Sequence, residues 1–112
     1  MTPQDGDPLP SDPAPSDPAS STPVLTRRLI VNNKRGLHAR AAAKFVMLAE
    51  KFDASVEVIR DGQAVPARSI MGLMMLGAAK GATLELRAEG WDAREALDAL
   101  AELVESGFDE RD

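Results

Sequence analysis

Four short segments of the chain are predicted to be β-strands, at residues 25–33, 54–60, 63–67 and 83–88. The clearest of them, residues 54–60 and 83–88, show the two-residue alternation of side chains that is typical of half-buried strands. Segments with a helical repeat lie between and after them, at residues 39–52, 69–76 and 93–105. The order β-α-β-β-α-β-α and the polar face of each strand predict an α+β domain, in which three helices cover one face of a four-stranded antiparallel sheet.

Local signals mark several ends of these elements. Asp61-Gly62 predicts a tight hairpin turn. Pro66 has no N–H to donate to a neighbouring strand, so the strand that contains it is expected at a sheet edge. Asp92 with Glu95 resembles a capping box at the start of the last helix.

The first 24 residues differ from the rest in composition. They contain four Asp, no Lys or Arg, frequent prolines and two copies of Ser-Asp-Pro-Ala. Such a segment cannot bury enough apolar surface to offset the entropy of ordering it. We therefore expect a disordered tail at residues 1–24 and one folded domain at residues 25–112.

The composition excludes several classes of site. The chain has no Cys and one His, and its carboxylates show no ligand-like spacing, so no metal or other cofactor is predicted. No apolar run is long enough to cross a membrane, and no signal peptide is recognisable. The net charge of -5 argues against nucleic acid as a partner. We expect a cytoplasmic monomer.

The single histidine, His38, stands where the first predicted helix begins, and Gly36 permits a turn just before it. The first N–H groups of a helix have no partners within it, so those of Ala39, Arg40 and Ala41 would form an anion site beside the imidazole. The Arg40 guanidinium could reach a phosphate held there. A lone histidine is most often without chemistry, but these neighbours predict that His38 carries a phosphoryl group.

Lys34, Arg35 and Lys44 add positive charge near the same place. An ordinary solvated charge cluster is the alternative interpretation of these residues. Nothing in the sequence resembles a P-loop or a catalytic acid–base constellation, so the phosphoryl group would come from a partner protein and not from a bound nucleotide. The sequence thus favours a carrier over an enzyme.

A second candidate site begins at Ser69, which suits the N-cap of the helix that follows it. A phosphoryl group on Ser69 would be electrostatically favoured at that position. The helix has more apolar residues than one inward face can bury. We therefore expect Ile70, Met71 and Met74 to form an exposed surface that docks partners, with Lys44 beside it.

Two stretches of the chain resemble the signatures of one family. The first reads Gly36-Leu37-His38-Ala39-Arg40-x-Ala42-Ala43-Lys44-Phe45-Val46, and the second reads Arg68-Ser69-Ile70-Met71-Gly72-Leu73-Met74. The first is similar to the active-site signature of the phosphocarrier HPr family of the phosphoenolpyruvate-dependent sugar phosphotransferase system. The second resembles the motif around that family's regulatory serine. The resemblance extends from Leu25 to about Phe108.

This resemblance implies an open-faced β-sandwich and phosphorylation of His38 at Nδ1 by enzyme I, with help from Arg40. It also implies transfer to an EIIA-type protein and phosphorylation of Ser69 by an HPr kinase/phosphorylase. Ala41 stands where most members of the family have proline. That substitution leans toward the regulatory branches, such as the nitrogen-type carriers.

Two other functions fit parts of the sequence. A regulatory interaction module of an incomplete phosphotransferase system, switched by phosphorylation, would differ only in whether the phosphoryl group leaves His38. A small nucleic-acid-binding domain would need stacking aromatic side chains, and the chain has no Tyr and only one Trp, Trp91.

Overall fold

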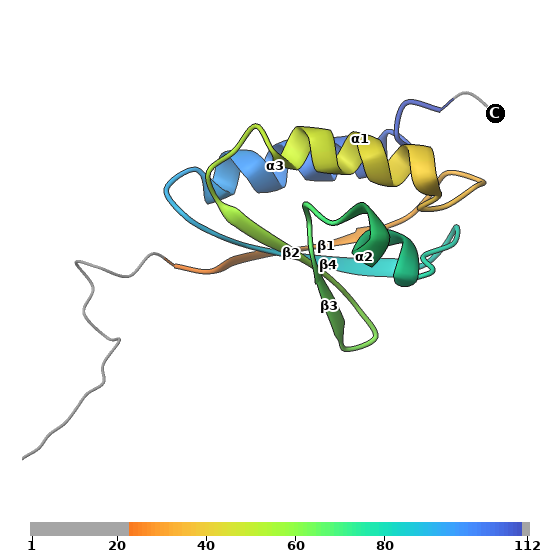
Figure 1. Ribbon diagram of the computed structural model, residues 1–112, viewed down its shortest axis with the longest axis horizontal. Helices are drawn as coiled ribbons and strands as arrows, with labels where there is room; N and C mark the ends of the chain where they lie inside the picture. Colours follow the sequence, from red (N-terminus) through yellow and green to blue (C-terminus); the bar gives the residue numbers. More distant parts are fainter. Residues whose placement is uncertain (1–22, 111–112) are drawn as a thin grey trace, which may run out of the picture.

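The computed structural model describes residues 23–110, so the tail predicted at residues 1–24 lies almost entirely outside the described residues. The elements follow the predicted order (Figure 1). They are β1 (Leu25–Ile30), α1 (Ala39–Ala49), β2 (Ser55–Arg60), β3 (Gln63–Pro66), α2 (Ile70–Met75), β4 (Thr83–Glu89) and α3 (Ala93–Glu105).

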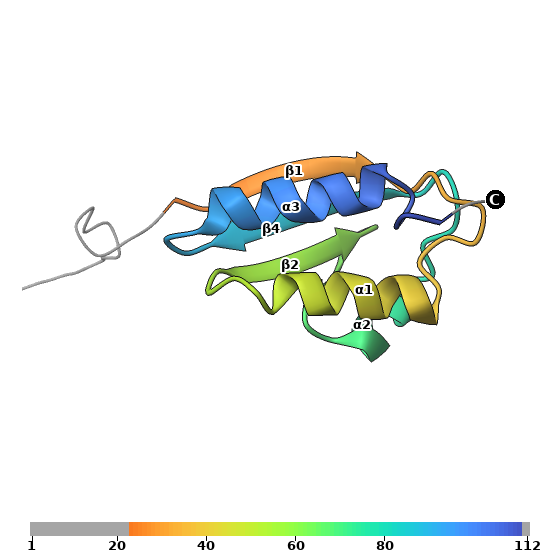
Figure 2. The same cartoon turned by 90° about the horizontal axis from the view of Figure 1, so that it is seen from above.

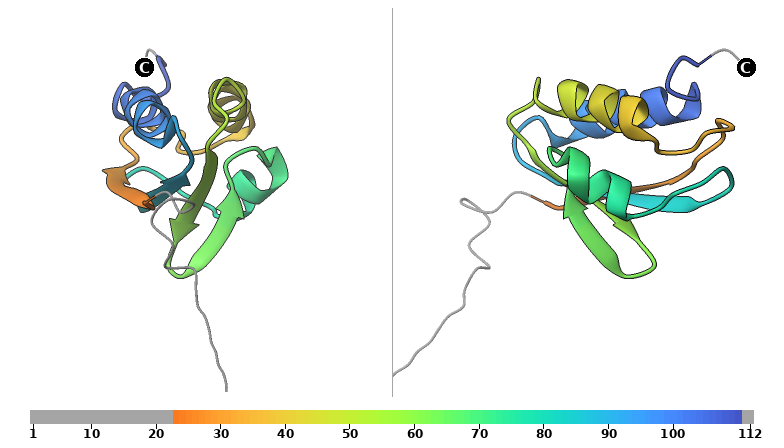
Figure 3. Two further views of the ribbon diagram at one scale, coloured as in Figure 1. Left: turned by 90° about the vertical axis from the view of Figure 1, so that its left-hand side faces the viewer. Right: turned by 45° about the vertical axis from the view of Figure 1, so that its right-hand side comes forward.

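The four strands form one antiparallel sheet in the order β1-β4-β2-β3. All three helices lie on one face of it, with α1 and α3 side by side and α2 next to α1 (Figures 2 and 3). The predicted α+β fold is therefore confirmed. The strand that contains Pro66 lies at a sheet edge, as expected for a residue without a backbone N–H.

The core fills the space between the sheet and the helices. Leu29 of β1 is paired with Leu84 of β4, and both side chains are buried. The largest fully buried side chains include Phe45 of α1 and Phe108, which follows α3. Burial of one such side chain contributes about 1.5–3 kcal/mol. Phe108 thus anchors the C-terminal segment to the domain.

Two predicted ends are wrong by three residues each, whereas the other boundaries differ by at most one residue. β1 ends at Ile30 instead of residue 33, and α1 ends at Ala49 instead of residue 52. After Ala49 the N–H groups of Lys51 and Phe52 bond to carbonyls three residues earlier, which tightens the last turn and turns the chain toward β2. The apolar repeat continues past the helix because Phe52 still packs against the core.

The capping box predicted at α3 is also wrong. Asp92 is the N-cap of α3, but its side chain makes no cap hydrogen bond. Its carboxylate oxygens accept hydrogen bonds from the backbone N–H groups of Asp53 and Ala54, at 2.9 and 2.8 Å. Hydrogen bonds to a buried carboxylate are among the stronger ones, so Asp92 ties the start of α3 to the start of β2.

Candidate functional site

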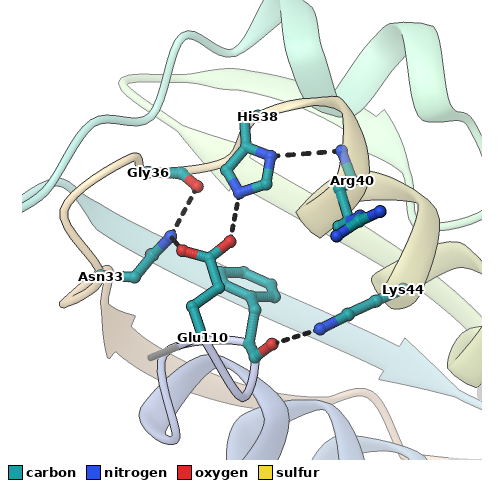
Figure 4. A network of polar contacts seen from close by, with 7 residues as sticks. Asn33, Gly36, His38, Arg40, Lys44 and Glu110 are labelled. Carbon is teal, nitrogen blue, oxygen red and sulfur yellow. Dashed lines mark hydrogen bonds and ion pairs between the residues drawn. The ribbon is translucent and has the colours of Figure 1, made fainter. Parts of the chain in front are cut away.

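The start of α1 is organised by His38. This residue is the N-cap and has the extended backbone of one, with φ -78° and ψ 178°. Its ring also caps the helix, because Nδ1 accepts a hydrogen bond of 3.2 Å from the backbone N–H of Arg40 (Figure 4). Nδ1 therefore faces the helix N-terminus, where unpaired N–H groups and the helix dipole favour an anion.

Gly36 is required by the loop that leads into His38. Its φ is +66°, and a Cβ atom at this position would lie 2.5 Å from the carbonyl oxygen of Ala78. That same oxygen accepts the backbone N–H of Leu37 at 2.8 Å. The close approach of the two loops thus depends on glycine and sets the direction in which the chain enters α1.

The other ring nitrogen of His38 contacts a residue that the sequence analysis did not identify. Nε2 is hydrogen-bonded to Oε2 of Glu110, and the other carboxylate oxygen accepts a 3.0 Å bond from the side chain of Asn33 (Figure 4). Asn33 also donates to the carbonyl of Gly36 at 2.9 Å. His38 and Glu110 are 72 positions apart, so no local pattern could have linked them.

Glu110 is held in place by the segment after α3. Phe108 is fully buried, and its carbonyl accepts a 2.7 Å hydrogen bond from Nζ of Lys44 (Figure 4). The backbone N–H of Glu110 bonds to the carbonyl of Gly107 at 3.1 Å. Phe108 and Asp109 both have a φ of 59°, which is uncommon for residues with a side chain. This turn brings the carboxylate of Glu110 back over His38.

The surroundings of Glu110 favour its ionised form. The hydrogen bond from Asn33 lowers the pKa of Glu110 below its ordinary value of 4.5, and the bond with His38 lowers it further. Partial burial opposes this shift, and the positive charge of Arg35 adds to it. At neutral pH, the Glu110 side chain that is hydrogen-bonded to Nε2 of His38 is therefore a carboxylate and not a carboxylic acid.

The predicted anion donors lie together at the start of α1. Ala39 and Arg40 are exposed there, and Ala41 is fully buried beneath them. Arg40 is exposed, and its guanidinium makes no hydrogen bond or ion pair with another residue of the range 23–110. Lys44 lies one turn further along, and its ammonium group is occupied by the carbonyl of Phe108.

Ser69 lies at the start of α2. Its backbone is extended and its hydroxyl oxygen accepts the N–H of Gly72 at 2.9 Å, so its predicted role as an N-cap is confirmed. The side chain is half-buried, and the space beside it is narrow, since a Cβ on Gly72 would lie 3.0 Å from the Ser69 hydroxyl.

The apolar residues of α2 divide between two faces. Leu73 and Leu76 are buried and take the inward positions. The exposed large apolar side chains of this helix are Ile70, Met71, Met74 and Met75. This exposed face belongs to a helix that packs beside α1, the helix for which His38 is the N-cap (Figure 3).

Among residues 23–110, no three His, Cys, Asp or Glu side chains come together as metal ligands would. The helices of that region are too short and too polar to cross a bilayer.

Comparison with known proteins agrees with this arrangement. The family profile described as the PTS HPr component phosphorylation site matches residues 25–106. The phosphocarrier protein HPr of Cupriavidus necator is 47% identical over 87 residues, which cover 78% of this chain and 98% of that protein. The phosphocarrier protein NPr of Shewanella violacea is 44% identical over 86 residues, covering 77% of this chain and 94% of that protein.

A solved structure shows the same fold. HPr from Thermoanaerobacter tengcongensis superposes with a TM-score of 0.75 at 46% identity, covering 78% of this chain and 98% of that one. These matches place the chain among the phosphocarrier proteins of the phosphotransferase system, which work through a phosphohistidine and are not enzymes. Within that class, the chain belongs to the HPr family.

Proposed function

We propose that His38 accepts a phosphoryl group at Nδ1 from phosphorylated enzyme I, which obtains it from phosphoenolpyruvate, and passes it to an EIIA-type protein. The observation that carries this proposal is the orientation of the ring. Nδ1 faces the N–H of Arg40 at the start of α1, whereas Nε2 is taken by Glu110. A phosphoryl group on Nδ1 would lie at a helix N-terminus, where an anion is stabilised.

Arg40 is the side chain best placed to assist. Its exposed guanidinium can form two parallel hydrogen bonds to phosphoryl oxygens without first breaking an ion pair within residues 23–110. The remaining contacts would come from the backbone N–H groups of Ala39, Arg40 and Ala41. A site with so few contacts suits a carrier, because tight binding of the phosphorylated state would oppose onward transfer.

The partners would dock on the apolar surface of α2. Ile70, Met71 and Met74 are exposed there, and methionine side chains adapt to differently shaped partners. Lys44, half-buried on α1, would border this surface. The partners would be enzyme I and an EIIA-type protein. We place the chain in the cytoplasm and expect it to act as a monomer.

A regulatory role is the second candidate, and two observations favour it. Ala41 stands where the family resemblance implies proline in most members, and a relative at 44% identity is named phosphocarrier protein NPr. In this version the phosphorylation state of His38 would change protein contacts. In the carrier version as in this one, Ser69 at the N-terminus of α2 would be a second, regulatory phosphorylation site for an HPr kinase/phosphorylase.

Labelling tests the carrier role. The chain is incubated with phosphoenolpyruvate and enzyme I, and acid-labile phosphate is measured. We expect wild type to be labelled and His38→Ala to remain unlabelled with its fold intact. Labelling of the alanine variant at the wild-type level would contradict the proposal. Subsequent loss of label to an added EIIA-type protein would distinguish the carrier from the purely regulatory module.

A further inference from the structure

The contact between His38 and Glu110 defines the state of the ring before any phosphoryl group arrives. The N–H of Arg40 can donate to Nδ1 only if that nitrogen carries a lone pair. The proton of the neutral ring is then on Nε2, where the Glu110 carboxylate accepts it. The two contacts therefore select one tautomer, and they leave the reactive lone pair at the helix N-terminus.

The same contact matters when phosphoryl transfer occurs. The Nδ1 lone pair attacks phosphorus and forms an N–P bond, and the bond from phosphorus to the donor breaks with its electron pair left on the donor. The Nε2 proton stays on the ring, so the ring gains one positive charge. That charge develops next to a carboxylate, which stabilises an imidazolium much as the buried aspartate does in a Ser-His-Asp triad.

The position of the carboxylate is built into the fold. Phe108 is buried, Lys44 holds its carbonyl, and Asn33 holds the second oxygen of Glu110. The Asn33 amide uses its NH₂ group on two acceptors, and its own oxygen is left buried without a partner in the described region. Leaving a buried oxygen unpaired costs about 1–3 kcal/mol of stability. The hydrogen bond from the Asn33 amide to Glu110 offsets part of this cost.

We propose that Glu110 is a positioning residue for phosphoryl transfer: its carboxylate holds the Nε2–H tautomer of His38, directs Nδ1 toward the donor and stabilises the positive charge that the ring acquires. This inference rests on the proposed function, because it assumes that Nδ1 of His38 is the acceptor. It adds a role for the C-terminal turn at residues 107–110. Arg40 and Glu110 would then act on opposite sides of the same ring.

Two measurements on the full chain test this role. The first is NMR of the unphosphorylated protein, in which His38 is the only imidazole. We expect a Nε2–H resonance that exchanges slowly with water in wild type and is lost in Glu110→Ala. An equally protected resonance in Glu110→Ala would overturn the proposal, because the carboxylate would then not be the acceptor.

The second measurement is the rate of phosphoryl transfer from phosphorylated enzyme I at increasing concentrations of the chain. Glu110→Gln keeps an acceptor and removes the charge, so we expect the limiting rate to fall about tenfold and the half-saturating concentration to stay within about twofold. Glu102→Gln is the matched control, since Glu102 is exposed on α3 and the same charge is removed. The control should behave as wild type.

The possible outcomes are distinct. An unchanged limiting rate in Glu110→Gln would overturn the positioning role. A rise in the half-saturating concentration alone would also overturn it, because Glu110 would then be a docking residue. If the limiting rate falls equally in Glu102→Gln, the effect comes from the change in net charge, and the positioning role is overturned as well. If wild type takes no label, the proposed function fails and the transfer role fails with it, whereas the NMR experiment still reports the tautomer.

Discussion

The two nitrogens of the His38 ring have different surroundings, and this difference separates the residues that hold the ring from those that would hold a phosphoryl group. Glu110 and Asn33 lie on the Nε2 side, and the N-terminus of α1 lies on the Nδ1 side. The Nδ1 side followed from local sequence, because Gly36, His38 and Arg40 lie within five residues of one another. The Nε2 side did not, because it depends on where the chain runs after α3.

Arg40 gives the first prediction at the scale of the residue. Arg40→Ala should slow phosphoryl transfer to His38, because the guanidinium is the exposed cation at the start of α1. The melting temperature should stay nearly the same, since the side chain makes no hydrogen bond or ion pair within residues 23–110. Transfer kinetics and thermal unfolding of the same preparation check both parts. An unaltered rate would mean that Arg40 belongs only to the solvated surface.

Glu110 gives a prediction on pH and stability. Hydrogen bonds from Asn33 and His38 lower the pKa of Glu110 in the folded state, so its carboxylate form stabilises the fold. This contribution is fully present above the ordinary value of 4.5 and is lost as pH falls through the lowered pKa. The unfolding free energies of wild type and Glu110→Gln should therefore converge as pH falls below 4.5 and through the lowered pKa.

Urea unfolding of both chains across that range measures the difference. Carboxylates common to the two chains contribute nearly equally and largely cancel. A gap between the two unfolding free energies that stays constant down to the lowest pH would show that the carboxylate of Glu110 has no special partner in the folded state.

At the scale of the element, α2 combines a cap with an exposed surface. Ser69→Ala removes the acceptor for the N–H of Gly72 and should cost about 1 kcal/mol of stability. Ser69→Asp keeps an acceptor and adds negative charge at a helix N-terminus, so the melting temperature should hold or rise slightly. The same charge would have to be desolvated when a partner covers the α2 surface.

The assay for Ser69 follows from this difference. Phosphorylation of His38 by enzyme I should show a raised half-saturating concentration for Ser69→Asp and near-normal kinetics for Ser69→Ala. If the aspartate variant is phosphorylated as readily as wild type, Ser69 is a helix cap without a regulatory role.

The kind of each element was predictable, whereas several ends were not. Strand alternation and helical repeat arise from burial on one face, and both are visible locally. The end of α1 and the caps depend on contacts elsewhere in the chain. The side chain of Asp92 bonds to Asp53 and Ala54, 39 and 38 positions away, and so forgoes the local cap that its sequence context predicts. Long-range hydrogen bonds of this kind leave no periodic signal.

At the scale of the whole molecule, the starts of β1 and α1 lie at opposite ends of the domain (Figure 1). The described chain enters β1 at Leu25, at one end of the sheet, and α1 begins with His38 near the other end (Figure 1). Among the described residues, the buried core that supports the site runs from Leu29 to Phe108. The tail carries four negative charges and many prolines, and it has too few apolar side chains to stabilise a fold by burial.

Removal of residues 2–23 should therefore leave both the melting temperature and the rate of phosphoryl transfer unchanged. The rate is the sharper test. If the four aspartates of the tail came close to His38, they would repel a phosphorylated donor, and their removal would speed association at low salt. Transfer from enzyme I is measured for the full and shortened chains at low and high ionic strength. Equal rates at both salt concentrations are expected. A lower melting temperature, or a rate difference that appears only at low salt, would show that the tail acts on the domain.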